Sequence, residues 1–128
     1  MADKAQTWVY TEDYVAESDA LTAARVVAAE LGATPVSSGT GAALRMLAAV
    51  SGARAVLEVG TGVWGLWLLD GMATDGVLTT IDMESELLGH ARRNFAAAGV
   101  SSHRTRLIAG RALDVLPRMA ARGYDLVV

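Results

Sequence analysis

Residue types and patterns that are absent from the sequence exclude several classes of site and ligand. Its 128 residues include no cysteine, which excludes a disulfide framework and a thiolate metal site. Lysine and arginine form no cluster larger than a pair such as Arg92-Arg93, and the net charge of −3 argues against nucleic-acid binding. No apolar run approaches the roughly 18 residues that a membrane-spanning helix requires. A small molecule is therefore the expected ligand.

The amino terminus also lacks a basic segment followed by an apolar one, so we expect no signal peptide and a cytoplasmic protein. Small apolar residues, in contrast, are abundant: 52% of the chain is hydrophobic although only 5% is aromatic. Such a composition suits helices packed on a parallel sheet. The length suits a single domain over residues 1–128, which can bury about two-thirds of the surface of the unfolded chain.

Apolar runs and turn residues alternate along the chain as strands and helices do in α/β proteins. Residues 1–16 are expected to form a weak helix or an arm. Further helices are expected over residues 18–31, 63–72 and 84–98 and beginning at Pro117. A polar loop over 34–41 is expected to lead into another helix that ends at Val50. Strands are expected at Ala55–Val59, Val77–Ile81, Thr105–Ile108 and Tyr124–Val128. With right-handed crossovers, this alternation predicts a Rossmann-like parallel sheet of order 3-2-1-4 with helices on both faces.

The most informative stretch begins with the apolar strand Ala55–Val59, continues through Gly60 and Gly62, and ends in an apolar helix. Glycines there let the backbone turn sharply and approach a ligand, although a simple tight turn would also use them. Asp82 ends the next strand, where an acid can accept hydrogen bonds from both hydroxyls of an adenosine ribose. An ordinary helix-capping role for Asp82 is the alternative.

Glu58 distinguishes between possible cofactors because a carboxylate inside an apolar strand is costly unless it meets a partner. The ammonium group of S-adenosylmethionine is such a partner, whereas turns that bind NAD usually carry an apolar residue at this position. Two alternatives stay open. In one, the Glu58 side chain reaches solvent at the strand end. In the other, Gly60, Gly62 and Gly65 form the dinucleotide-binding pattern G-x-G-x-x-G.

Three segments together resemble the class I S-adenosylmethionine-dependent O-methyltransferases, specifically the bacterial branch of the catechol and caffeoyl-CoA O-methyltransferase-like family. These segments are 55–69, Gly76–Asp82 and 104–112, and the likeness extends from the helix at Ala23-Ala24-Arg25 to the strand at 124–127. The resemblance implies an enzyme that transfers a methyl group from S-adenosylmethionine to a hydroxyl of a small, catechol-like acceptor. It also implies a divalent cation that positions this acceptor.

Carried over residue by residue, the resemblance implies that Val36 packs on the cofactor with Ser37 nearby. It implies that Asp82 binds the ribose and that Gly110-Arg111-Ala112 borders the adenine, with a helix-entry turn as the alternative for this trio. The cofactor-binding residues implied in this way, together with Trp64, are Val36, Ser37, Glu58, Gly60, Thr61, Gly62, Trp64, Asp82, Gly110, Arg111 and Ala112.

This sequence departs from the family pattern in two ways. The family usually has two more residues after Gly-Thr-Gly, whereas here Val63-Trp64 leads directly into Gly65, so Trp64 takes the position of a serine near the methionine tail. We expect this shorter loop to alter cofactor affinity. The family's cation ligands follow the fourth strand and would lie beyond Val128, so no metal ligand or catalytic residue is identified here. His90 and His103 are both expected to be exposed.

We therefore expect the cofactor-binding part of an incomplete methyltransferase fold. A non-catalytic fragment that persists by self-association is the alternative from a different class, because the fourth strand would be an uncovered edge. Self-association is expected at that edge or at the N-terminal arm, which carries Trp8, Tyr10 and Tyr14. A homo-oligomer follows under either interpretation.

Overall fold

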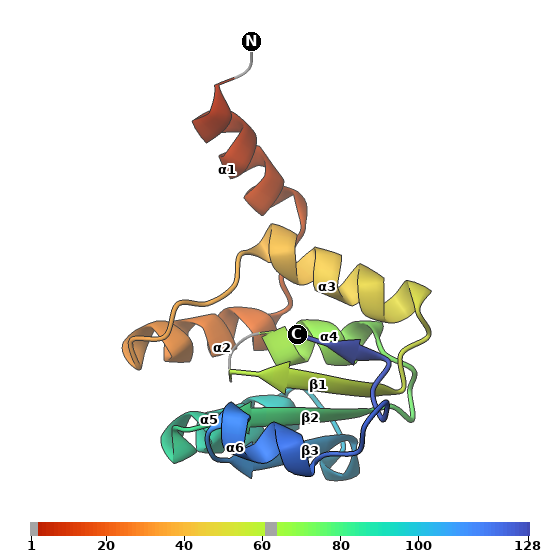
Figure 1. The fold of residues 1–128 in the computed structure, drawn as a ribbon. Helices are drawn as coiled ribbons and strands as arrows, with labels where there is room; N and C mark the ends of the chain where they lie inside the picture. The colour runs from red at the N-terminus through yellow and green to blue at the C-terminus, as the bar shows by residue number, and fades with distance from the viewer. Residues whose placement is uncertain (1–2, 61–63) are drawn as a thin grey trace.

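A computed structural model describes residues 3–60 and 64–128. Figure 1 shows a parallel sheet with helices on both of its faces and one N-terminal helix that projects from the body. In chain order the elements are α1 (Lys4–Tyr14), α2 (Asp19–Glu30), α3 (Ser38–Val50), β1 (Ala55–Val59), α4 (Trp64–Gly71), β2 (Val77–Asp82), α5 (Ser85–Ala97), the 3₁₀ turn η1 (Ser102–Arg104), β3 (Thr105–Ala109), α6 (Ala112–Val115), the 3₁₀ turn η2 (Leu116–Arg118) and β4 (Leu126–Val127).

The four strands pair in the order β3-β2-β1-β4, and every pairing is parallel, which confirms the predicted α/β topology. β1 is the buried centre of the sheet: Val56, Leu57 and Glu58 are at most 3% exposed. Its register against β2 places Glu58 beside Thr80. Because parallel strands end at one edge, the carboxyl ends of β1, β2 and β3 lie together.

Helix boundaries follow local capping chemistry. The Ser18 hydroxyl accepts a hydrogen bond from the Leu21 amide at 3.3 Å at the start of α2, and Gly32 ends that segment with φ +73°, as expected. The expected loop over 34–41 is wrong at its end, because α3 begins at Ser38. Ser37 caps α3 by accepting from the Thr40 amide at 3.2 Å.

Two glycines let α3 and α4 pack closely against each other. A Cβ atom on Gly41 would lie 2.2 Å from Trp67 Nε1, and one on Gly71 would lie 2.2 Å from the carbonyl oxygen of Arg45. Trp67 is completely buried, and the guanidinium of Arg45 lies 5.3 Å from the centre of its ring. Gly41 is therefore a packing residue within a helix, and the sequence pattern had placed it in a loop.

The last part of the chain differs most from expectation. The predicted strand over 124–128 is shorter, since β4 comprises only Leu126–Val127. Backbone hydrogen bonds to β1 continue on either side of it: the Asp125 amide donates to the Ala55 carbonyl at 2.7 Å and the Val128 amide to the Leu57 carbonyl at 2.9 Å. The Asp125 carboxylate accepts from the amides of Arg54 at 2.8 Å and Ala55 at 3.0 Å. Pro117 lies in η2 and does not begin an α-helix, since α6 already begins at Ala112.

The N-terminal segment is a helix, α1, with no buried residue. It is joined to the body near its C-terminal end, where Glu12 Oε2 accepts from the Ser38 amide at 2.8 Å and the Ser38 hydroxyl donates to the Glu12 carbonyl at 2.6 Å. In the part of the chain that the structure covers, no helix has the length and apolar character to cross a membrane.

Candidate functional site

A cavity of about 300 Å³ lies at the carboxyl edge of the sheet, where a parallel α/β sheet binds its ligands. Backbone hydrogen bonds fix its floor: the Gly60 amide donates to the Ile81 carbonyl and the Gly110 amide to the Asp82 carbonyl, both at 2.9 Å. Gly60 has φ +93°, and no atom lies within 4 Å of the place where its Cβ would be. The lining residues are Val59, Gly60, Ile81, Asp82, Met83, Glu84, Gly110 and Ala112.

Asp82 lies half-buried at the end of β2 and lines this cavity. Its Oδ1 accepts a hydrogen bond from the Glu84 amide at 2.8 Å, one residue before α5 begins. This bond is not a helix cap, because the N-cap residue of α5 is Glu84 and no side chain caps that helix, so the capping alternative for Asp82 is wrong. The Asp82 residue also lines the cavity.

Glu58 is the most unusual residue near this edge, because its side chain is completely buried in the centre of the sheet. The Thr80 hydroxyl donates to Glu58 Oε2 at 2.8 Å, while Oε1 has no hydrogen-bond partner among the described residues. Burial raises the pKa of Glu58 to about 8, opposed by hydrogen bonding from the Thr80 hydroxyl and the Gly65 backbone amide and assisted by the negative charge of Asp82. The alternative in which Glu58 reaches solvent is wrong.

The third glycine of G-x-G-x-x-G has a packing explanation. A Cβ atom on Gly65 would lie 2.8 Å from Phe95 Cζ and 3.0 Å from Leu78 Cδ2, so Gly65 lets α4 sit closely on β2 and α5. This contact accounts for the glycine without a dinucleotide. The observation that had favoured an NAD-type site therefore no longer separates the two cofactors.

Comparison with known proteins decides the family. A model of the O-methyltransferase family matches residues 6–127, almost the entire chain. The chain belongs to this family. A relative from Mycobacteroides abscessus that is named an O-methyltransferase is 52% identical over 121 residues, which are 93% of this chain and 56% of the relative. The family resemblance inferred from sequence motifs is thereby confirmed.

Solved structures agree with this assignment to the O-methyltransferase family. A Corynebacterium glutamicum protein superposes with a TM-score of 0.88 at 34% identity, covering 98% of this chain and 61% of that one. The O-methyltransferase TomG from Streptomyces achromogenes, solved in complex with SAM, gives 0.85 at 33% identity with the same coverage. The chain thus spans a little over half the length of the relatives that it matches.

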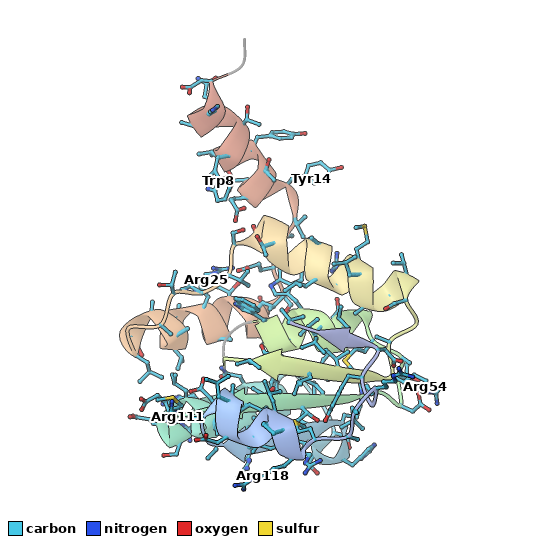
Figure 2. The ribbon with its side chains drawn as sticks, in the orientation of Figure 1. Trp8, Tyr14, Arg25, Arg54, Arg111 and Arg118 are labelled. Atoms are coloured by element: carbon cyan, nitrogen blue, oxygen red, sulfur yellow. The ribbon has the colours of Figure 1, made fainter. Side chains whose placement is uncertain are left out.

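In this member of the O-methyltransferase family, the structure brings some of the predicted cofactor residues together and separates others. Gly60, Asp82, Gly110 and Ala112 line one cavity. Arg111 is exposed, its side chain 4.0 Å from Asp114, and Figure 2 shows it on the surface beside α6. Arg111 is not among the residues that line the cavity.

The remaining predicted residues lie beside the cavity or outside the described chain. Val36 is buried in the hydrophobic core and Ser37 caps α3, while Trp64 begins α4 half-buried against the core. None of these three lines the cavity at the strand ends. Thr61 and Gly62 lie outside the described residues, together with Val63 of the shortened loop.

Sequence reasoning missed four residues of the cavity wall, the apolar Val59, Ile81 and Met83 and the acidic Glu84. Met83 follows Asp82 directly and is 65% exposed, an unusual position for a large apolar side chain. The signal available in the sequence was its place immediately after the acid that ends a buried strand. Of the two histidines, His103 is exposed as expected, whereas His90 is half-buried beside α2.

A larger cavity of about 580 Å³ lies elsewhere, between the start of α2, α4 and the segment after α5. Its two arginines already have partners, since Arg45 pairs with Asp70 at 3.2 Å and Arg104 donates to the carbonyls of Gly76 and Ala73 at 3.1 Å. It shares no residue with the cavity at the strand ends. We therefore place the candidate site at the smaller cavity, which Gly60, Asp82 and Gly110 line. The completely buried Glu58 is not among the residues that line it.

Proposed function

We propose that this chain is the S-adenosylmethionine-binding part of an O-methyltransferase that methylates a hydroxyl group of a small, catechol-like acceptor. Family membership supports the reaction class, and the related TomG was solved with SAM bound. The observation in this chain that carries the proposal is Glu58, a completely buried carboxyl whose Oε1 lacks a partner among the described residues. A buried polar atom of this kind marks a position where a ligand group completes the hydrogen bonding.

The residues at the strand ends fit the parts of S-adenosylmethionine by their chemistry. Asp82 would accept hydrogen bonds from the ribose hydroxyls, and Glu58 would provide the opposite charge for the ammonium group. Gly60 leaves open space where any other residue would place a Cβ atom. Met83 and Ala112 supply apolar surface to the same cavity, which suits an adenine ring.

When bound, S-adenosylmethionine supplies a methyl group on a sulfonium centre, which the acceptor oxygen attacks in line. The residues of this chain would hold and orient the cofactor for that attack. No group of three or more histidine, cysteine or acidic residues comes together as a metal site in residues 3–60 and 64–128. We therefore assign no residue of this chain to the family's divalent cation and none to proton removal from the acceptor.

Isothermal titration calorimetry with S-adenosylmethionine and with NAD tests this proposal directly. We expect heat of binding with S-adenosylmethionine and none with NAD. Asp82→Asn should weaken binding by about tenfold or more, since a charge-assisted hydrogen bond is worth about 1.5–3 kcal/mol. Glu86→Gln, which changes an exposed acid in the first turn of α5, is the matched control. Heat with NAD and none with S-adenosylmethionine would overturn the proposal.

We also propose that the chain self-associates through α1. The side chains of Trp8, Tyr10 and Tyr14 are 63%, 68% and 74% exposed, and Figure 2 shows α1 standing away from the other elements. Exposed aromatic groups of this size are typical of protein interfaces. Sedimentation velocity of the double variant Trp8→Ser/Tyr14→Ser should show a smaller species than the unmodified chain. A strictly monomeric unmodified chain would contradict this proposal.

A further inference from the structure

Thr80 and Glu58 form an isolated polar pair inside the sheet. They are register partners on β2 and β1, their exposures are 1% and 0%, and their side-chain oxygens lie 2.8 Å apart. Valine would fill the same place on β2 without a hydroxyl group, and strand interiors favour such residues. A buried hydroxyl directed at a buried carboxyl therefore requires an explanation beyond packing.

We propose that Thr80 is a positioning residue that keeps Glu58 Oε2 engaged and Oε1 available to the ammonium group of the cofactor, and that Glu58 releases a proton when this ammonium binds. The inference rests on the proposed function and adds a proton-linked step to it. Thr80 acts only through Glu58, so it is not a catalytic residue. Its single donor proton is already used by Oε2, which leaves Oε1 for the ligand.

The surroundings of Glu58 explain why a proton would leave. A carboxylate in a dry interior is costly without a cation, so burial favours the neutral acid and raises the pKa to about 8. The ionisable group that bears on Glu58 from β2 is Asp82, whose negative charge acts in the same direction. Among the described residues, neither β4 (Leu126–Val127) nor the first six residues of α4 (64–69) carry a cation, although the Gly65 backbone amide of α4 bonds the carboxyl and lowers its pKa.

The ligand's ammonium is therefore the charge that would make ionised Glu58 favourable in its buried position. Release of one proton per bound ligand makes the affinity rise with pH, because the free protein must first lose the proton that the complex lacks. With a free pKa of about 8, the affinity should increase about 25-fold between pH 6.0 and 7.5. Over this range the α-amino group of the ligand stays largely protonated.

The experiment is calorimetric titration with S-adenosylhomocysteine, which carries the same amino-acid part and no reactive methyl group. Titrations at pH 6.0, 6.5, 7.0 and 7.5, each in two buffers of different ionisation enthalpy, give both the affinity and the number of protons released. We expect close to one proton at pH 6.5. Methylthioadenosine, which lacks the ammonium group, is the matched ligand and should bind with no proton release and no dependence on pH.

Two variants at position 80 separate positioning from simple packing. Thr80→Val removes the hydrogen-bond donor and keeps the side-chain shape, so Glu58 ionises less readily. The affinity for S-adenosylhomocysteine at pH 7 should fall about tenfold, and its rise with pH should move to higher pH. Thr80→Ser restores the hydroxyl and should restore the profile. Methylthioadenosine affinity should be the same in all three proteins, because it does not call on Glu58; a packing defect would weaken both ligands together.

The possible outcomes distinguish this inference from the proposed function. The inference would be overturned, and the proposed function would stand, if S-adenosylhomocysteine bound without proton release. Its affinity would then not depend on pH, either in the unmodified protein or in Thr80→Val. Failure of the unmodified protein to bind either adenosine ligand would overturn both. The proton count on the unmodified protein needs no variant, so the test does not depend on whether Thr80→Val folds.

Discussion

Replacing Glu58 by glutamine should change how the stability of the protein depends on pH. In the unfolded chain Glu58 loses its proton near its ordinary pKa of 4.5, whereas the folded protein keeps the proton up to a pKa of about 8. Between these values the unfolded state binds fewer protons, so the free energy of unfolding falls by up to about 1.4 kcal/mol per pH unit as the pH rises. At pH 7 the accumulated loss is about 3 kcal/mol.

Glu58→Gln keeps the shape of the neutral acid and cannot ionise, so it removes this slope. The glutamine amide introduces its own donors, and their cost is the same at every pH, so the informative quantity is the change with pH. The stability of the variant relative to the unmodified protein should improve by roughly 2.5 kcal/mol between pH 5 and pH 7.

Urea unfolding followed by far-ultraviolet circular dichroism at pH 5, 6, 7 and 8 measures this change. Glu86→Gln, at an exposed site in α5, is the control and should leave the pH profile of the unmodified protein as it is. Parallel profiles for the unmodified protein and Glu58→Gln would refute the reasoning, because they would show that Glu58 ionises alike in the folded and unfolded states.

Three further changes test other parts of the structure. Gly41→Ala should destabilise the protein by about 1–2 kcal/mol in urea unfolding, because overpacking against Trp67 outweighs the gain in helix propensity. Gly89→Ala, whose Cβ would meet Arg93 Nη1 at an ordinary 3.7 Å, should stabilise it by up to about 1 kcal/mol. Equal stabilisation by both would contradict the packing role. Asp125→Ala should lower the urea midpoint at pH 7, and the difference should shrink below pH 3.8, since backbone amides hold the pKa of Asp125 below its usual value. Asp82→Asn should lower the pKa of Glu58 by removing a nearby negative charge. In urea unfolding, the free energy of unfolding should then stop falling at a lower pH than in the unmodified protein.

The topology was predictable because it depends on patterns that each segment carries by itself. Apolar runs separated by turn residues gave the strands, and their spacing, too long for hairpins, required parallel pairing through helices. The capping serine before α2 and the glycine after it were equally local signals. Asp82 and the glycines of the turn were found in the same way, since they come directly at strand ends.

What the sequence did not reveal depends on contacts between distant segments. Gly41 suggested a loop, and only the ring of Trp67, 26 positions later, explains a glycine inside α3. The sequence left open whether the Glu58 side chain is buried or reaches solvent, because an apolar strand pattern does not give the register of β1 against β2. The hydrogen bonds from the amides of Arg54 and Ala55 to the Asp125 carboxylate likewise join segments about 70 positions apart, which no local pattern shows.

The close contact between α3 and α4 limits how the segments around the cofactor site can move. Val36 and Ser37 come just before α3 and Trp64 begins α4, so both helices start at residues predicted to bind the cofactor. At Gly41 the backbone of α3 lies against the ring of Trp67, and at Gly71 the backbone of α4 lies against the Arg45 carbonyl, so neither contact has room for a small shift. The residues at the starts of α3 and α4 should therefore move as one rigid unit, and any opening of the site has to come from elsewhere in the chain.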